Sequence, residues 1–404
     1  MINPSINGWI DKYFSEQKSA TIPAARQPDE LYKKVRETGF IYGHIVSLDT
    51  AVPILTKGWL ENEISKVALL TTLYSIHGLT TNENNPQKFV LNALSFYNEM
   101  NPQGFNLFNK VMPDSSASLN LEKIIDNRVQ TNIDIISKNF SHIVTNALLF
   151  IDILAFRQYL IHGAIPEKYL SKIEESIINI VSLALKTKSV KSKYDDLLIK
   201  LFESSVRYSK FHKIDVKSQT FGMDELKLDY FTNELEKQYL IDMAGMALWT
   251  DGIIENNEAY FLYKLGQLLG VSDDFVADSM EQTNFFINTY KNEIPYFNYS
   301  NPVKHFYDQT TQTVLKLITR NKNRLLKEII QSKELMLLLA NSTRRDLSEK
   351  EKKKVKKQLL DIFKSIPSLA IFLLPGGSLL LPIFIKFIPT LLPSAFNENL
   401  DNDD

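Results

Sequence analysis

The chain has 404 residues, of which 44% are hydrophobic and 23% are charged, and its formal net charge is −1. That length is enough for two or three domains with sizeable cores, and the near-neutral charge shows no global basic excess of the kind that nucleic-acid-binding proteins carry. Because cysteine is absent, disulfides, thiolate catalysis and cysteine–zinc sites are excluded.

The N-terminal region, residues 1–60, is predicted to be a short helix followed by a linker. It begins MINPSINGWIDKYFSEQK, which lacks the basic stretch and apolar core of a secretory signal. The polar, proline-containing stretch EQKSATIPAARQPDE, at 16–30, marks the first connection after this helix. No secretory signal is therefore visible in this region.

The largest predicted region, residues 61–315, is a helical body. In LEKIIDNRVQTNIDIISKNF (121–140) and EKYLSKIEESIINIVSLALK (167–186), apolar residues recur at steps of three and four, the spacing of one helix face. Strand-like alternation bounded by hairpin turns is hard to find. The sequence therefore predicts an all-α fold, a multi-helix bundle built from helical hairpins.

Three stretches of this body share one pattern: an apolar helix, a His-Gly or Asp-Gly pair, a short turn and a second apolar helix. They carry Gly78, Gly163 and Gly252, which are 85 and 89 residues apart. Glycine adopts a left-handed backbone conformation without steric cost, so each glycine is predicted to end its helix. The near-equal spacing is compatible with repeated hairpin units, although periods this long are a weak signal.

The third stretch, ALWTDGIIENNEAYFLYKLGQLLGVS, resembles the tellurite-resistance B (TerB-like) family of helical proteins. The shared element is a helix ending in Asp-Gly-x-Ile, followed by a glutamate-bearing helix that finishes in Leu-Gly, within residues 240–275. The matching residues are Asp251, Gly252, Ile254, Glu258, Leu269 and Gly270. The resemblance implies TerB-like helical hairpins, a link to membrane-associated stress complexes, and Asp251 and Glu258 as ligands of a divalent cation.

The chemistry of Asp251 and Glu258 leaves a second interpretation open. An aspartate at a helix end and a glutamate in the first turn of the next helix are ordinary capping and dipole interactions. Two carboxylates also fall short of the roughly six to eight oxygen ligands that calcium takes. Apart from this divalent cation, no cofactor is expected.

No catalytic constellation is found in the sequence. Four histidines are scattered without the spacing of a metal-binding motif: His44, His142, His212 and His305. No GxxxxGK[ST], GxGxxG or GxSxG motif occurs, so nucleotide binding and acyl transfer have no anchor. We therefore expect a protein that is not an enzyme and that binds no nucleic acid.

Residues 316–364 are predicted to form basic amphipathic helices. Between 320 and 360 there are 13 Lys or Arg and 5 Asp or Glu residues, a net charge of +8, whereas the tail 397–404 has 4 acidic residues and no basic one. This asymmetry is typical of a cytoplasmic region that precedes a membrane span. Six lysines crowd the turns nearest to residue 365: Lys350, Lys352, Lys353, Lys354, Lys356 and Lys357. We predict that they bind anionic lipid headgroups at a membrane surface, and the alternative is a solvated helix face.

An apolar segment, SIPSLAIFLLPGGSLLLPIFIKFIPTLLPSAF, occupies residues 365–396. Its first 21 residues, 365–385, carry no charge, and a helix of that length would just cross a hydrocarbon core of about 30 Å. Pro367, Pro375 and Pro382 interrupt the run. Proline is tolerated in a membrane helix and breaks a soluble one. The segment is therefore predicted to be a kinked span, a re-entrant hairpin or a pair of buried helices.

The stretch 347–396 resembles the transmembrane segment of the leucine-zipper/EF-hand transmembrane (LETM) family. The shared pattern is a basic amphipathic helix, a motif that runs from an aspartate to a proline, an apolar run with internal prolines, a lysine, and a closing motif rich in proline. The matching positions are Asp361, Phe363, Lys364, Pro367, Pro375, Leu381, Pro382, Lys386, Phe387, Pro389, Leu392, Pro393, Ser394 and Phe396.

The LETM resemblance implies a membrane protein connected with cation/proton exchange and volume control, as in the mitochondrial inner-membrane members. Ribosome binding and calcium sensing are not expected, because the ribosome-binding-like domain and EF-hand of those proteins are not seen after Phe396. With a TerB-like body before the segment, the layout resembles a bacterial LETM-related protein of a group sometimes labelled biofilm-associated.

Two functions follow from these patterns. The first is a non-enzymatic protein of the inner (cytoplasmic) membrane that contributes to cation/proton homeostasis or acts as a membrane-anchored scaffold. One apolar segment cannot line a pore alone, so ion transport requires a homo-oligomer or a membrane protein partner. The alternative is a soluble, cytoplasmic TerB-like interaction scaffold that buries residues 365–396 in its own core.

Overall fold

The regular elements of the computed structural model are helices throughout the described part of the chain. That part comprises residues 2–17, 27–100, 116–129, 146–188, 222–249, 254–293, 314–345, 347–366, 369 and 385. The all-α fold class predicted from the sequence is therefore confirmed. The chain divides into two compact units, one of residues 1–55, 61–133 and 137–299, and one of residues 56–60, 134–136 and 300–404.

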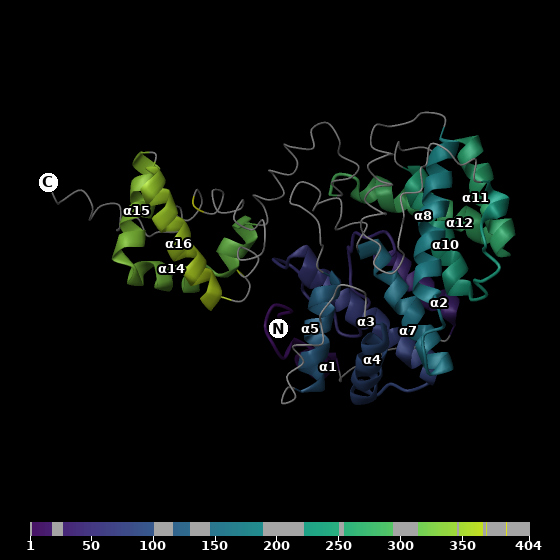
Figure 1. The fold of residues 1–404 in the computed structure, drawn as a ribbon, viewed down its shortest axis with the longest axis horizontal. Helices are drawn as coiled ribbons and strands as arrows, with labels where there is room; N and C mark the ends of the chain where they lie inside the picture. Colours follow the sequence, from purple (N-terminus) through teal and green to yellow (C-terminus); the bar gives the residue numbers. More distant parts are fainter. Residues whose placement is uncertain are drawn as a thin grey trace. The chain divides into compact units, whose positions relative to one another are not determined.

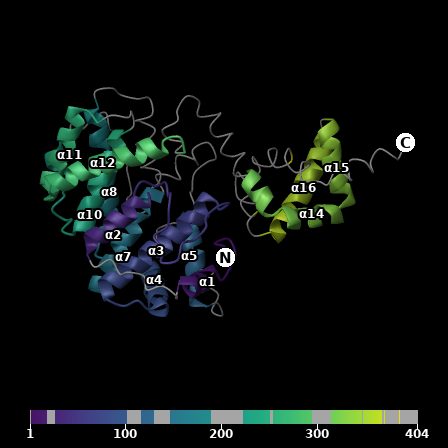
Figure 2. The ribbon, with the colours of Figure 1, turned by 180° about the vertical axis from the view of Figure 1, so that it is seen from behind.

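The helices of the first unit belong to two groups that α2 and α7 connect (Figures 1 and 2). Their bounds are α1 (Trp9–Gln17), α2 (Pro28–Glu37), α3 (Glu61–Thr81), α4 (Pro86–Met100), α5 (Ala117–Val129), α7 (Phe150–His162), α8 (Tyr169–Thr187), the 3₁₀ turn η2 (Met223–Glu225), α10 (Glu234–Leu248), α11 (Asn256–Leu269) and α12 (Asp273–Tyr290).

Each group is built around one mostly buried helix. In the first group α3 packs against α4, α5 and α7, and α1 packs against α5; in the second, α10 packs against α8, α11 and α12. The helix α2 contacts both α3 and α10, and α7 contacts both α3 and α8. Because α3 and α10 bury residues around most of their circumference, they are core helices rather than surface amphipathic ones.

In the described parts of the two predicted helical stretches, most of the apolar residues that recur at helical spacing are buried. In the first stretch the apolar spacing selects six residues, Leu121, Ile124, Ile125, Val129, Ile133 and Ile136, and the first four are buried on α5. The remaining two, Ile133 and Ile136, lie outside the described residues. On α8 five of the six predicted face residues are buried, Ile173, Ile177, Ile180, Val181 and Ala184, whereas the sixth, Leu170, is partly exposed. One face of each helix thus enters the core of the first unit.

The three predicted glycine helix ends have different outcomes. Gly163 ends α7 in a left-handed conformation with φ of 74°, so that prediction is confirmed. The prediction for Gly78 is wrong, because α3 continues through it to Thr81 and Asn82 takes the left-handed conformation instead. A Cβ at position 78 would lie 2.6 Å from Asn84 Oδ1, so this glycine makes room for a side chain. Gly252 lies outside the described residues.

The second unit is a small helical unit with its own core. It contains a helix at 314–320, α14 (Lys322–Gln331), α15 (Lys333–Arg344) and α16 (Glu349–Ser365), and α14, α15 and α16 pack against one another. Their inward faces bury Val314, Leu317, Ile318, Leu325, Ile329, Leu335, Leu338, Leu339, Leu347, Val355, Leu359, Ile362, Phe363, Ile366 and Leu369.

Most of the predicted membrane segment lies outside the described residues. Of 365–396, the structure describes residues 365, 366, 369 and 385. Among the helices in the described ranges, none has both the length and the apolar composition that crossing a membrane requires. The division into five regions at 60, 315, 364 and 396 stays a prediction.

Candidate functional site

The candidate site is built on α16, whose first turn is fixed by a capping box. Ser348 Oγ accepts a hydrogen bond from the Glu351 backbone N–H at 3.4 Å, and the Glu351 carboxylate accepts one from the Ser348 backbone N–H at 2.7 Å. These two bonds satisfy backbone donors that a helix start leaves unpaired. Arg345 donates to the same carboxylate at 2.6 and 2.9 Å. Hydrogen bonds from Arg345 and Ser348 lower the pKa of Glu351 to about 2, so the carboxylate stays charged.

The spacing of its apolar residues makes α16 amphipathic. Val355, Leu359, Ile362 and Phe363 are buried in the core of the second unit, and Ile366 continues this face past the helix end. Steps of three and four residues place such side chains on one face of an α-helix. The buried face fixes the rotation of α16 about its own axis. It therefore decides which lysines point away from the unit.

The six lysines predicted to meet a membrane surface are all exposed, but they have different partners. Lys352 pairs with Glu349 at 3.0 Å, and Lys354 pairs with Glu334 of α15 at 2.6 Å. The bond to Glu334 raises the pKa of Lys354. The other four form no ion pair within the described part of the chain: Lys350, Lys353, Lys356 and Lys357.

Three of these four lysines form a line along α16. Lys350, Lys353 and Lys357 are spaced by three and four residues, so neighbouring side chains lie about one helical turn apart on the same face. At about 100° per residue, this face lies opposite the buried face of Val355 and Leu359. We call Lys350, Lys353 and Lys357 the lysine stripe.

Asp361 and Lys364, the charged residues of the LETM-like motif, form an exposed pair near the end of α16. Lys364 Nζ donates to Asp361 Oδ1 at 2.7 Å, and this bond lowers the pKa of Asp361. The Asp361 carboxylate therefore stays charged next to the apolar segment. The other predicted residues of the membrane segment lie outside the described residues: Pro367, Pro375, Pro382, Lys386, Pro389 and Pro393.

The described apolar residues of the segment lie against the core of the second unit. Ile366 has 1% of its surface exposed and Leu369 has none, and both belong to that core. Ile385 is partly buried and packs against the same core. For these three residues, the contacts are those expected if the protein buries the segment itself. They bear on no other residue of the run.

The predicted metal ligand Glu258 has a capping role in the structure. It is the third residue of α11, it is 1% exposed, and its Oε2 accepts a hydrogen bond from the Glu255 backbone N–H at 2.8 Å. Its predicted partner ligand, Asp251, lies outside the described residues. Within the described ranges, no three Asp, Glu or His side chains are grouped closely enough to hold a metal ion. The divalent cation stays a prediction.

Sequence reasoning misses a buried polar cluster around Asp242 of α10. Tyr32 OH donates to Asp242 Oδ2 at 2.6 Å, Ser279 Oγ donates to Oδ1, and Arg36 Nη1 lies 3.8 Å from Oδ1. Arg36 also pairs with Asp278 of α12. Burial raises the pKa of Asp242. The cluster links α2 and α12 to α10, and its one signal in the sequence is an aspartate inside the apolar run YLIDMAGMAL.

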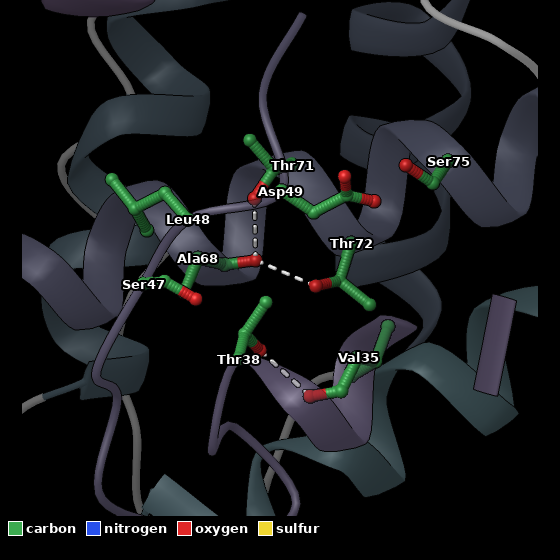
Figure 3. A pocket seen from close by; sticks show the side chains of 9 residues that line it. All are labelled: Val35, Thr38, Ser47, Leu48, Asp49, Ala68, Thr71, Thr72 and Ser75. Carbon is green, nitrogen blue, oxygen red and sulfur yellow. Dashed lines mark hydrogen bonds between the residues drawn. The ribbon is translucent and has the colours of Figure 1, made fainter. Parts of the chain in front are cut away.

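A small hollow between α2, α3 and the loop at 47–49 is a poor ligand site (Figure 3). Its empty volume is about 270 Å³, which includes space open to solvent. The hydroxyls of Thr38, Thr71 and Thr72 line it, and each donates to a backbone carbonyl of its own helical turn. Ser47, Asp49 and Ser75 also line the hollow, but no metal-binding cluster is found among the described residues.

Comparison with known proteins relates the region around α16 to a family. Residues 347–404 match a family model described as "LETM1-like, RBD". The match begins at Leu347, so it includes the capping box, the lysine stripe and the Asp361–Lys364 pair. The C-terminal region of this chain is therefore related to the LETM family, as its pattern of charges and prolines predicts.

One curated relative shows the same relationship over a limited length. A 75-residue part of the chain is 37% identical to the mitochondrial proton/calcium exchanger protein of Drosophila melanogaster. This part is 19% of the present chain and 7% of the relative. No solved structure matches the chain. Both similarities thus cover a small part of the chain, and the TerB-like resemblance of the helical body stays a prediction.

Proposed function

We propose that the chain is a non-enzymatic, membrane-associated helical protein that contributes to cation/proton homeostasis, with its apolar segment entering the membrane. The observation that carries this proposal is the order of parts in the LETM-like region. A basic amphipathic helix, α16, runs directly into 21 residues without a charge. Such a run has about the length that a helical span needs.

The charge distribution indicates how the protein is oriented in the membrane, and the single apolar segment indicates how many subunits ion transport would need. The basic residues precede the apolar run and the acidic ones follow it, which favours a cytoplasmic N-terminal body. Because one segment cannot enclose an ion path, transport requires a homo-oligomer or a membrane protein partner, whereas a membrane-anchored scaffold requires neither. The proton/calcium exchange in the name of the Drosophila relative supports cations and protons as the solutes.

Membrane association is tested by fractionating cells that express the full-length chain. We expect the protein to sediment with membranes and to resist extraction by alkaline carbonate. Leu373→Arg together with Leu380→Arg, near the middle of the uncharged run, should release it, because each charge at a span centre costs about 3 kcal/mol. Leu55→Arg together with Leu91→Arg, at exposed positions, is the matched control. Wild-type protein that remains soluble without detergent would contradict the proposal.

Ion movement is tested separately, in vesicles loaded with a pH-sensitive dye. Vesicles with reconstituted wild-type protein should couple an imposed cation gradient to a change in internal pH, and crosslinking should show an oligomer. If the protein resists carbonate extraction and forms an oligomer but moves no ions, the membrane-anchored scaffold would remain as its function.

The soluble scaffold is the second candidate, and the burial of Ile366, Leu369 and Ile385 favours it. It is tested by thiol labelling of a Leu369→Cys variant, since the natural chain has no cysteine that would react. If the protein buries its own segment, the introduced thiol in detergent-free protein resists a water-soluble maleimide until urea unfolds the second unit. Rapid labelling in soluble protein would contradict this candidate.

A further inference from the structure

We propose that the lysine stripe, Lys350, Lys353 and Lys357, is a binding surface for the anionic phospholipid headgroups of a bilayer. In this arrangement α16 lies along the membrane surface while its apolar face stays packed in the second unit. The inference rests on the proposed function, because it names the membrane component that the same region contacts.

The geometry of α16 supports a planar, negatively charged partner. The stripe runs over two helical turns, so its ends lie about 10 Å apart along the helix axis. It faces away from the buried side chains, so bringing it to a flat surface requires no unpacking of the core. A headgroup layer is such a surface.

The distribution of ion pairs singles out these lysines from the other basic residues of α16. Lys352 and Lys354 are held by Glu349 and Glu334, so part of their charge is already compensated. The stripe has no ion-pair partner in the described part of the chain. Asp361, one turn after Lys357, is paired with Lys364, but it also attracts Lys357, as Glu349 attracts Lys353. The stripe therefore carries positive charge that forms no ion pair of its own and that nearby carboxylates compensate only in part.

A membrane fits the stripe better than a nucleic acid does. The exposed positions of α16 carry lysines and a few acidic or polar residues, with no aromatic side chain on which a base could stack. The formal net charge of the whole chain, −1, also lacks the basic excess of nucleic-acid-binding proteins. The helix that carries the stripe leads directly into the uncharged run.

The test compares full-length variants of equal net charge in vesicle flotation. The stripe variant is Lys350→Gln with Lys353→Gln and Lys357→Gln. The control variant is Lys333→Gln with Lys352→Gln and Lys354→Gln, which removes three exposed lysines outside the stripe. Each protein is diluted from detergent into vesicles of phosphatidylcholine alone or with phosphatidylglycerol, at low and high salt. A third variant with arginine at the stripe positions tests whether charge is sufficient.

The wild-type protein should bind the anionic vesicles more tightly, and salt should reduce the difference. A lysine near an anionic surface contributes on the order of fivefold, so the stripe variant should lose about 100-fold of this preference. The control variant should lose much less, and the arginine variant should keep the wild-type preference. Binding to neutral vesicles should be the same for all four proteins.

Other outcomes would overturn the inference in distinguishable ways. Equal wild-type binding to both kinds of vesicle would reject the stripe and leave membrane insertion intact. Equal losses in the stripe and control variants would mean that net charge acts without the stripe geometry. Stripe-dependent retention by duplex RNA, with no preference for anionic vesicles, would assign the surface to nucleic acid. Failure to bind either vesicle would reject the inference and the proposed function together.

Discussion

Arg128 of α5 and Asp152 of α7 form a buried bidentate ion pair. Arg128 Nε donates to Asp152 Oδ2 at 2.7 Å, and Arg128 Nη2 donates to Oδ1. Tyr97 OH also donates to Oδ2, at 3.0 Å. The Arg128 and Asp152 side chains are 5% and 0% exposed. The pair thus joins two helices of the first group almost entirely out of contact with solvent.

The same types of residue recur around Asp242 in the second group. Asp242 receives a hydrogen bond from Tyr32 and lies 3.8 Å from Arg36, and like Asp152 it follows an isoleucine within an apolar helix. Each group of helices therefore contains one buried aspartate with a tyrosine and an arginine as partners. A buried charge is tolerated only where such partners replace water.

Removing the carboxylate of Asp152 is expected to destabilise the first unit strongly. Asp152→Ala leaves the Arg128 charge buried without its counter-ion, and breaking such a pair costs about 3–5 kcal/mol of unfolding free energy. Urea unfolding should be followed by fluorescence in a Trp59→Phe background, because the remaining tryptophans, Trp9 and Trp249, belong to the first unit.

The matched control for Asp152→Ala is the exposed pair of Lys88 and Glu83, which are 2.7 Å apart. Exposed ion pairs contribute less than about 1 kcal/mol, so Glu83→Ala should change stability little. Similar small losses in both variants would show that the Arg128–Asp152 pair is not as buried as the structure has it.

The raised pKa of Asp242 predicts a loss of stability as pH rises. Burial is the main cause of that raised pKa, so the folded protein keeps the proton at pH values where the unfolded chain has released it. The contribution of Asp242 is therefore fully present below its ordinary pKa of 3.8 and is lost as pH rises from there through the folded pKa. Asp242→Asn cannot titrate. Urea unfolding from about pH 4 to 7 should show that the wild type loses unfolding free energy relative to the variant as pH rises. A constant difference would contradict this prediction.

The buried histidine of α3 predicts the opposite pH dependence at higher pH. Asn92 Nδ2 lies 3.1 Å from His77 Nε2, so with the amide as donor the ring is neutral and Nε2 accepts. Burial lowers the pKa of His77 below its ordinary value of 6.5. Because the unfolded chain then binds the proton more readily, stability should fall as pH drops through 6.5 and level off below the folded pKa.

Substituting His77 separates this effect from other titrations. His77→Gln offers an amide oxygen to Asn92 and has no charge to gain, so its stability should depend less on pH between about 5 and 7.5. The measurement is again urea unfolding in the Trp59→Phe background. Parallel pH curves for wild type and variant would rule out His77 as the source.

Glu258 provides a test of capping against metal binding. Its hydrogen bond to the Glu255 backbone N–H predicts that Glu258→Ala lowers stability by about 1 kcal/mol, in EDTA and in calcium or magnesium alike. Glu258→Gln should lose less, because the amide oxygen can still accept. A melting temperature that calcium raises for wild type, but not for Glu258→Gln or Asp251→Ala, would instead support the divalent cation.

Local sequence pattern was sufficient for the all-α fold class and for the amphipathic character of α16. Apolar spacing predicts the buried sides of α5, α8 and α16, because a helix face is defined by residues three and four apart. The pairing of Lys352 with Glu349 has the same spacing and is also a local property. The end of α3 was not predictable from Gly78, since this glycine keeps a helical backbone and Asn82 takes the left-handed conformation instead.

Contacts between distant residues explain what the sequence alone did not indicate. Lys354 is compensated by Glu334, twenty residues away, so the division of the lysines into paired and unpaired sets needed the packing of α15 against α16. The bond from Tyr32 to Asp242 spans 210 residues. No periodicity carries such information, because it arises only when separate helices meet.

The core under the candidate site predicts a local effect of truncating Phe363. This ring is fully buried in the second unit, so Phe363→Ala removes packing among α14, α15 and α16 and should cost about 3–5 kcal/mol. Because the chain has two units, amide hydrogen exchange read by mass spectrometry is more informative than one melting temperature. Exchange should accelerate across 314–366 and stay unchanged in α3 and α10.

Phe285→Ala is the matched control, since that ring on α12 is 64% exposed and its loss should change stability by less than about 0.5 kcal/mol. Unchanged exchange in α14 and α15 of the Phe363 variant would mean that α16 does not share their core, and the orientation of the lysine stripe would then lose its physical basis.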